Sequence, residues 1–333
     1  WKVTGDFKSL NTADKILPPI LMGIVGTVAV FWSLSGFVIQ VAQKMKSTYL
    51  KDTNMFVLRQ INNKINTTIV SMSVICLMLF MTISILSVSL ALRNTMQREL
   101  VKMTPVDLNL YKTVNLPESY MKKEVKTTEA QRADSRITIQ ETLKNNGLDM
   151  TLLKDVIEIP IYATNDLTMG DFLKNKLQSI KLEFPMLAFE TAEEIVKISD
   201  YNKIASLYGI EQYELKENEY IVLCDFDSQK ELRDEALKDG NNVLNIVGKQ
   251  YKSKYNECKT GYIQMATNHT NTGIILVPDD CNLTESMKEQ YLLAANYNAD
   301  TKEGKEEIEK IFVDDNSELL QNLDKNGLNI DGR

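Results

Sequence analysis

Two uncharged, strongly apolar stretches stand near the start of the chain, and a long polar body follows them. The first covers residues 16–43, and the core of the second covers residues 65–92. Each is longer than the roughly 20 helical residues that cross a hydrocarbon layer of about 30 Å. The pattern therefore predicts two transmembrane helices, over residues 16–43 and 65–97. The alternative, buried helices of a large soluble protein, is disfavoured by two stretches of this length without a single charge.

The connection between the two apolar stretches, residues 44–64, is short and basic. It contains five Lys or Arg residues and one acidic residue, Asp52. Short loops rich in Lys and Arg remain on the cytoplasmic side of a membrane. We therefore predict that this loop is cytoplasmic and that residues 1–15 and 98–333 lie outside. The expected molecule is a multi-pass protein of the cell membrane with a large extracellular domain.

The second half of this connection has an amphipathic pattern. Met55, Leu58, Ile61 and Ile65 recur at spacings of three and four residues, which places them on one face of a helix. Two arrangements fit this pattern: an amphipathic helix that lies along the inner membrane surface, or a cytoplasmic extension of the second transmembrane helix. We take these four residues as a candidate membrane-surface coupling face.

The polar body, residues 98–333, shows mixed periodicity. Runs rich in aliphatic and aromatic residues predict strands, and polar runs with capping signals predict helices. The predicted strands cover residues 156–164, 219–226, 242–247, 261–267 and 273–278, and the predicted helices cover 117–146, 200–209, 230–238 and 301–312. Because strands and helices are interspersed, the pattern predicts an extracytoplasmic α+β domain.

Single residues refine several of these elements. Pro160 has no N–H to donate, so the strand that contains it is predicted at a sheet edge. Ser228 and Glu231 have the spacing of a capping box at the start of a helix that stops at Gly240. Residues 268–273 are typical of a hairpin connection between the two strands that flank them.

Charge separates the chain into two parts. Residues 1–97 have nine Lys or Arg and three acidic residues, a net charge of +6, whereas residues 98–333 have a net charge of −13. An acidic body without a basic stripe argues against nucleic acid as a partner.

The chain has four cysteines. Cys76 falls in the second apolar stretch, and Cys224, Cys258 and Cys281 fall in the polar body. Three is an odd number, which disfavours a full disulfide framework. The three thiols are either all free, which we prefer, or Cys258 and Cys281 form one bridge.

Residues with catalytic or metal-binding potential are few. The one histidine, His269, lies in a polar turn and is expected to be a turn residue rather than a ligand. Asp225 and Asp227 follow a predicted strand, where such a pair either holds a divalent cation or, as we prefer, is a solvated strand end. The chain contains no HExxH, GxSxG or GxxxxGK[ST] motif.

Three further acidic pairs are not expected to form catalytic or metal-binding sites. Glu193–Glu194 and Glu306–Glu307 read as the exposed surfaces of helices, and Asp279–Asp280 is a weaker cation candidate than Asp225 and Asp227. We therefore expect no catalytic residue, no metal site and no cofactor on this chain, and we do not expect an enzyme.

The run around the second apolar stretch resembles a known family. Residues 49–96, YLKDTNMFVLRQINNKINTTIVSMSVICLMLFMTISILSVSLALRNTM, closely resemble the FtsX-like permeases of ABC transporters, and most closely the bacitracin-resistance (BceB-like) permeases of Gram-positive bacteria. FWSLSGFVIQVAQK, residues 31–44, fits the span before this element. Residues 198–223 and 248–280 resemble recurring segments of the family's extracellular domain, so the resemblance touches most of the chain.

The resemblance implies a permease of about ten spans, with a large extracytoplasmic domain between two late spans. The chain begins with Trp1 and lacks the early and the returning spans, so we expect a fragment. The implied partners are a separate ABC ATPase subunit that binds and hydrolyses ATP, a peptide antibiotic or peptide–lipid complex, membrane lipid and, in sensing systems, a membrane histidine kinase.

The implied function is resistance to antimicrobial peptides, or their sensing. In this reading a continuous helix from Leu58 to about Met96, with Ser73, Leu77 and Ser84 along it, acts as a lever between the ATPase and the extracellular domain. Two alternatives remain: a mechanotransmitter that controls a cell-wall hydrolase or lipoprotein export, and a sensor domain that binds a ligand and signals to a membrane kinase.

Overall fold

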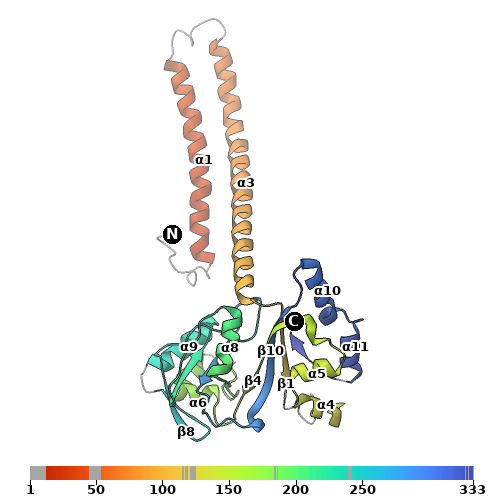
Figure 1. Cartoon of the computed structure of the whole chain (residues 1–333). Helices are drawn as coiled ribbons and strands as arrows, with labels where there is room; N and C mark the ends of the chain where they lie inside the picture. Colours follow the sequence, from red (N-terminus) through yellow and green to blue (C-terminus); the bar gives the residue numbers. More distant parts are fainter. Residues whose placement is uncertain are drawn as a thin grey trace. The chain divides into compact units, whose positions relative to one another are not determined.

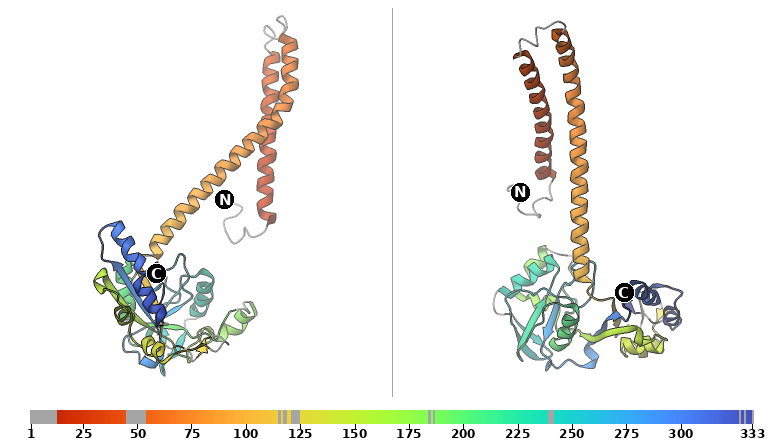
Figure 2. Two further views of the ribbon diagram at one scale, coloured as in Figure 1. Left: turned by 90° about the vertical axis from the view of Figure 1, so that its right-hand side faces the viewer. Right: turned by 45° about the horizontal axis from the view of Figure 1, so that its top comes forward.

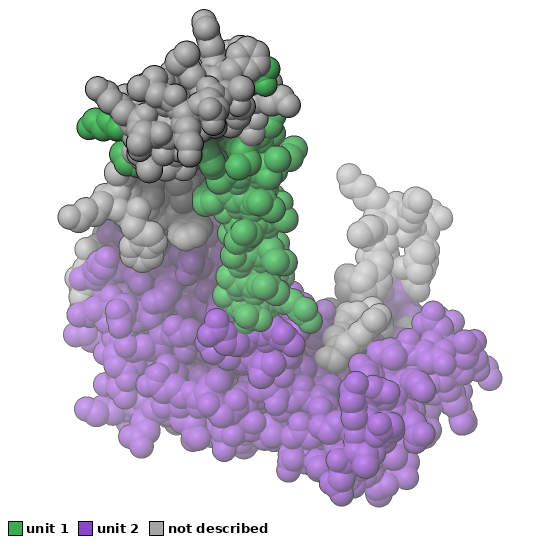
Figure 3. Space-filling view, turned by 90° about the horizontal axis from the view of Figure 1, so that it is seen from above, with its two compact units in different colours: residues 1–96 green, residues 97–333 purple. Residues whose placement is uncertain are grey.

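The structure is a computed structural model, and it divides the chain into two compact units, residues 1–96 and 97–333 (Figure 3). It describes residues 13–44, 54–114, 116, 119–120, 125–183, 185, 187–238, 242–326, 328 and 330–332. Most of the predicted lead-in 1–15, residues 45–53 of the predicted cytoplasmic connection, and the predicted helix stop at Gly240 lie outside the described residues.

The first unit is built from two long helices, α1 (Ala13–Lys44) and α3 (Asn54–Met103), and the last turns of α3, from Gln97 onward, belong to the second unit. Among the residues that the structure describes, Ser71–Met103 is the one helical stretch long and apolar enough to cross a membrane, and an 18-residue window within it has a mean hydropathy of 2.5. The apolar stretch of α1 is shorter, Ile20–Ser33. Large aliphatic and aromatic side chains are exposed along α3, at Met78, Phe80 and Ile85 for example.

Helix α3 is continuous for 50 residues, so the chain from Asn54 to Ile65 is an extension of the same helix. Of the two arrangements considered for the connection, this backbone matches the extension. The side chains of Met55, Leu58, Ile61 and Ile65 lie outside the description.

The second unit has the α+β character that its sequence predicts. In the described part of the chain, nine strands form one mixed sheet (Figure 1). Their spatial order is β11 (Asp331–Gly332), β1 (Leu108–Thr113), β10 (Lys288–Tyr297), β4 (Leu153–Tyr162), β5 (Glu194–Lys197), β9 (Ile274–Val277), β6 (Glu219–Leu223), β8 (Lys249–Ser253) and β7 (Val243–Ile246). A separate hairpin pairs β2 (Ser119–Tyr120) with β3 (Val125–Lys126).

Eight further helices belong to this unit among its described residues. They are α4 (Glu129–Ser135), α5 (Ile139–Asn145), α6 (Met169–Leu173), α7 (Leu177–Glu183), α8 (Ile198–Tyr208), α9 (Asp227–Lys238), α10 (Lys302–Val313) and α11 (Glu318–Lys325), with 3₁₀ turns at Met150–Leu152, Lys174–Lys176 and Glu285–Met287. Figures 1 and 2 show α5, α10 and α11 grouped beside β1 and β10, apart from α6, α8 and α9.

The middle of the sheet is buried on both faces, because alternate residues of a strand point to opposite sides. Ile195 packs in one cluster with Phe172 of α6 and Leu232 of α9, whereas the next residue, Val196, packs in another with Ile204 of α8. A third cluster joins β1 and β10 to α5, α10 and α11. Strand β9 is buried at all four positions, which explains its continuous aliphatic run.

Several predicted elements are confirmed. Helix α8 ends at Gly209, which has a φ of 67°, and α10 begins after its N-cap Thr301. The strands predicted over 219–226, 242–247 and 273–278 correspond to β6, β7 and β9.

The prediction of one helix over residues 117–146 is wrong. Thr128 with Gln131 and Thr138 with Glu141 form two capping boxes, so two short helices, α4 and α5, begin at separate points. The predicted Ser228 capping box is also wrong, because α9 already begins at Asp227.

The strand predicted over 261–267 is absent from the described sheet, and the hairpin predicted after it is therefore wrong. Tyr262 and Ile263 are buried, but in a loop. Tyr262 stacks on Tyr208 at a ring-centroid distance of 5.6 Å, and the Tyr208 hydroxyl donates a hydrogen bond to the Ile263 carbonyl. The alternating pattern of this run serves tertiary packing instead of a strand ladder.

Strand β4 contains Pro160, as predicted, but it lies between β10 and β5 and is not an edge strand. Among the described residues β5 pairs with β4 only through Tyr162. The proline is tolerated because the β5 side of β4 has no ladder at its position.

Candidate functional site

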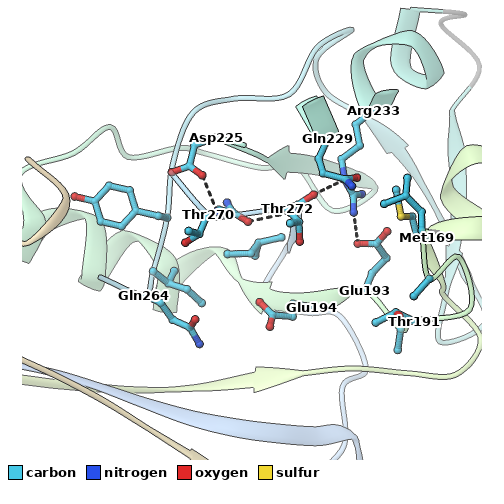
Figure 4. Close-up of a pocket in the computed structure, with 18 of the residues that line it drawn as sticks. Met169, Thr191, Glu193, Glu194, Asp225, Gln229, Arg233, Gln264, Thr270 and Thr272 are labelled. Carbon is cyan, nitrogen blue, oxygen red and sulfur yellow. Dashed lines mark hydrogen bonds and ion pairs between the residues drawn. The ribbon is translucent and has the colours of Figure 1, made fainter. Parts of the chain in front are cut away.

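A cavity of about 330 Å³ lies within the second unit, at one end of strands β5, β6 and β9 (Figure 4). Its walls come from the start of β5, the chain just after β6, helix α9, the loop before β9 and the final residue of α3, Met103. Its polar lining residues include Glu193, Glu194, Asp225, Gln229, Arg233, Gln264, Thr270, Asn271 and Thr272, and its apolar ones include Met103, Met169, Leu187, Tyr262, Ile263 and Ile274.

A buried ion pair forms one wall of this cavity. The Arg233 Nη2 and Glu193 Oε2 atoms are 2.8 Å apart, and both side chains are only 3% exposed. Burial alone would lower the pKa of Arg233, but the charge of Glu193 and its hydrogen bond outweigh burial and raise that pKa. The Arg233 Nε donates a hydrogen bond to the Thr272 carbonyl, and its guanidinium lies 5.0 Å from the Phe172 ring centroid.

Gly273 makes room for this guanidinium. Its φ is +151°, in a region that L residues avoid, and a Cβ built on it would overlap the Arg233 guanidinium carbon and nitrogens. A glycine at this position is therefore required by both its backbone and its neighbour.

Three polar atoms at the cavity have no hydrogen-bond partner among the described residues. They are Glu193 Oε1, Arg233 Nη1 and Gln229 Oε1, and all three are buried. A buried polar atom without a partner costs about 1–3 kcal/mol, and all three atoms belong to residues that line this one cavity.

Glu194, the first residue of β5, is a carboxylate of the cavity that no cation among the described residues neutralises. It is half-buried, and no hydrogen bond or ion pair joins its side chain to another described residue. Burial, and then the neighbouring charge of Glu193, raise the pKa of Glu194. It also lines a second, more open cavity of about 700 Å³, together with Asp166 and Glu289.

Asp225 lies at the rim and is fully engaged. Its carboxylate accepts a hydrogen bond from the Asn271 N–H at 2.7 Å and lies 3.0 Å from His269 Nδ1. The other ring nitrogen of His269 is 3.6 Å from Glu99 Oε2, near the end of α3.

The last residues of α3, from Gln97 to Met103, belong to the second unit and pack within it. Met103 is 2% exposed and packs in the cluster of β4, α8 and β9. The Tyr262 hydroxyl donates a hydrogen bond to the Lys102 carbonyl. Met103 and Tyr262 both line the cavity, so the final turn of α3 is part of its wall.

The residues that the sequence singled out on α3 lie elsewhere. Ser73 is buried, and Leu77 and Ser84 are half-buried; their spacing places all three on one face of the helix. Asp225 and Asp227 have different surroundings. Asp225 forms hydrogen bonds with His269 and Asn271, whereas Asp227 is the first residue of α9. No group of three metal-ligating side chains occurs in the described part of the chain.

The reading of Glu193–Glu194 as helix surface is wrong, since Glu193 is a buried ion-pair partner and Glu194 begins a strand. Glu306 and Glu307 are exposed on α10, as predicted. His269 is in an irregular segment, as expected of a turn residue.

All four cysteines are free, so Cys258 and Cys281 form no bridge. Cys224, Cys258 and Cys281 are buried, and burial raises the pKa of each, that of Cys224 to about 11. Asp280 pairs with Lys249 at 3.1 Å, and Asp279 accepts a hydrogen bond from the Ser199 N–H near the start of α8.

Sequence reasoning missed the residues that matter most in the cavity. Gln229 and Arg233 are four residues apart on α9, on the same face as the buried Leu232 and Leu237. Two polar residues on the apolar face of a helix were the available signal.

Comparisons of the chain with protein-family models, with curated proteins and with solved structures find no match.

Proposed function

We propose that this chain is part of an FtsX-like ABC permease, in which motion of α3 is coupled to a ligand cavity in an extracellular domain. The observation that carries this proposal is that Met103, the last residue of α3, lines the cavity. One continuous helix therefore contains both the apolar stretch and a residue of the cavity wall.

The length of α3 supports a coupling role. At 1.5 Å per residue, its 50 residues extend about 75 Å. The hydrocarbon core of a bilayer takes up about 30 Å of that length. The apolar side chains exposed along α3 are stable in lipid and unfavourable in water, which supports a membrane-spanning role, with α1 as the second span.

The contacts at the end of α3 would transmit its movement. Met103 is buried in the core, the Lys102 carbonyl is bonded to Tyr262, and Glu99 faces His269, which in turn contacts Asp225 at the cavity rim. In the proposed cycle a partner ATPase hydrolyses ATP and moves the cytoplasmic end of α3. The helix then changes the cavity wall and so the affinity for a peptide antibiotic or peptide–lipid complex.

A proline in the apolar part of the helix tests this coupling. Ser84→Pro removes a backbone hydrogen bond and kinks α3, at a cost of about 3 kcal/mol in a helix interior. In the complete permease we expect this variant to lose peptide-antibiotic resistance, measured as the minimal inhibitory concentration, while the extracellular domain stays folded. Ser84→Ala is the matched control and keeps resistance. Unchanged resistance in Ser84→Pro would refute the lever.

A second candidate function is a ligand-binding sensor, and the unpartnered polar atoms of the cavity favour it. In that case α3 signals to a membrane kinase without any transport. An adjacent ATPase gene favours the permease, and an adjacent hydrolase gene favours a mechanotransmitter. A kinase gene without an ATPase gene favours the sensor.

A further inference from the structure

We propose that the cavity binds a protonated primary amine on an unbranched alkyl stem, as in a lysine side chain, and that Glu194 is the carboxylate that recognises it. This proposal depends only on residues of the second unit and therefore does not rest on the permease assignment.

The charges around the cavity favour a cation. Arg233 is neutralised by Glu193 at 2.8 Å, and Asp225 is engaged by His269 and the Asn271 N–H. Glu194 is left with no partner among the described residues. An anionic ligand would meet this uncompensated carboxylate, whereas a cation would pair with it.

The hydrogen-bonding groups match an ammonium as well. An ammonium has three N–H donors and no acceptor. Among the described lining residues, acceptors without a partner outnumber such donors. Glu193 Oε1, Gln229 Oε1 and the carboxylate of Glu194 are acceptors, against one donor, Arg233 Nη1, whose guanidinium is already paired with Glu193. Glu193 and Gln229 are at least nine-tenths buried, and they reach the cavity from two elements, the chain before β5 and helix α9 (Figure 4).

The apolar lining suits the stem of the ligand. Met103, Met169, Leu187, Tyr262 and Ile274 would contact methylene groups while the charged end reaches the carboxylates. A volume of about 330 Å³ is at the small end of ligand pockets, so it fits one side chain or a small molecule rather than a folded segment.

The second, more open cavity of about 700 Å³ also favours a cationic ligand. Glu194 lines both spaces, and the second adds Asp166 and Glu289, whose carboxylates form no ion pair with a described residue. A peptide with one lysine in the first cavity would have its neighbouring residues over an acidic surface. An aminolipid headgroup is a poorer fit, because its phosphate lies two carbons from the amine and would face these carboxylates.

Binding is tested on the whole chain in phosphatidylcholine nanodiscs, whose lipid has no primary amine. The probe is tetralysine with blocked ends, compared by calorimetry with the same peptide acetylated on every lysine. We expect the wild type to bind tetralysine and not the acetylated peptide. Glu194→Gln should weaken binding about tenfold or more, since a charge-assisted pair is lost. Glu194→Asp should keep a measurable part of the affinity.

Glu190→Gln is the matched control. Glu190 is exposed on the loop that precedes β5 and is not part of the lining of the 330 Å³ cavity, and its replacement changes the net charge by the same amount. It should change the affinity less than about twofold. Near-ultraviolet dichroism of the tyrosines confirms that each variant is folded.

Equal losses in Glu190→Gln and Glu194→Gln would overturn the proposal, because they would indicate attraction to the net charge alone. Equal affinity for the acetylated peptide, or no binding of tetralysine up to about 1 mM, would overturn it too. Tighter binding of phosphoethanolamine than of tetralysine would assign the cavity to a lipid headgroup instead.

Discussion

Gly273 offers a sharp test of how the cavity wall is built. Its Cα faces the guanidinium of Arg233, and alanine at this position would place a methyl group where the guanidinium lies. Arg233 cannot move aside freely, since it is 3% exposed, is paired with Glu193 and packs on Phe172. The substitution therefore forces the buried ion pair apart.

The expected cost follows from two effects. Separating a buried ion pair leaves an uncompensated charge and costs about 3–5 kcal/mol. The φ of +151° adds backbone strain of about 1–3 kcal/mol for a residue with a Cβ. The sum of the two effects is at least about 4 kcal/mol of unfolding free energy. A loss of about 4 kcal/mol lowers the melting temperature of a unit of this size by about 8–16 °C.

The assay uses the tyrosines, because 12 of the 13 tyrosines fall in residues 98–333 and both tryptophans fall before them. Thermal melts followed by near-ultraviolet dichroism therefore report the second unit. Gly209→Ala is the matched control: its φ of +67° is also positive, but no atom lies within 4 Å of the added Cβ. It should cost only about 1–2 kcal/mol of strain. Equal melting temperatures for the two variants would refute the packing argument.

Two further predictions concern the carboxylates of the cavity. Glu193→Gln should destabilise the second unit by about 3–5 kcal/mol, because it leaves the charge of Arg233 buried without a partner. The double variant Glu193→Leu with Arg233→Met should cost much less, because it leaves no buried charge. Thermal melts that show equal losses of stability for the two variants would contradict this prediction. The pKa of Glu194 is raised in the folded protein, so folding favours the protonated form of this side chain. The stability that protonated Glu194 contributes is fully present below pH 4.5, the ordinary pKa of the group, and is lost as the pH rises through the raised pKa. Glu194→Gln should therefore raise the melting temperature at pH 7 relative to the wild type and leave it nearly unchanged at pH 4, and the opposite pH trend would count against the assignment.

The elements with local signals were predictable from the sequence. A glycine that ends α8 and a threonine that caps α10 act within a few residues, so a short window of sequence contains them. The continuous aliphatic run of β9 reflects burial on both faces of the sheet. The class of the second unit, α+β, followed from these elements.

The cavity could not be predicted in the same way. Its ion pair joins Glu193 to Arg233, 40 positions apart, and its unpaired carboxylate begins a strand that local pattern assigned to a helix. Strand β5 is short, and its pairing with β9 decides its conformation. The two acidic residues therefore acquire their different roles from tertiary structure, one paired and buried, the other unpaired at the cavity.

The central claim is that one unbroken helix joins the apolar stretch of α3 to the cavity wall. Spin labels attached through unnatural residues at Met78 and Val101, both exposed, would measure this in lipid nanodiscs. Twenty-three residues of α-helix predict a narrow distribution of distances centred near about 35 Å. A broad distribution, or one centred well below that distance, would contradict the account, because the helix would then be broken between its apolar stretch and the cavity.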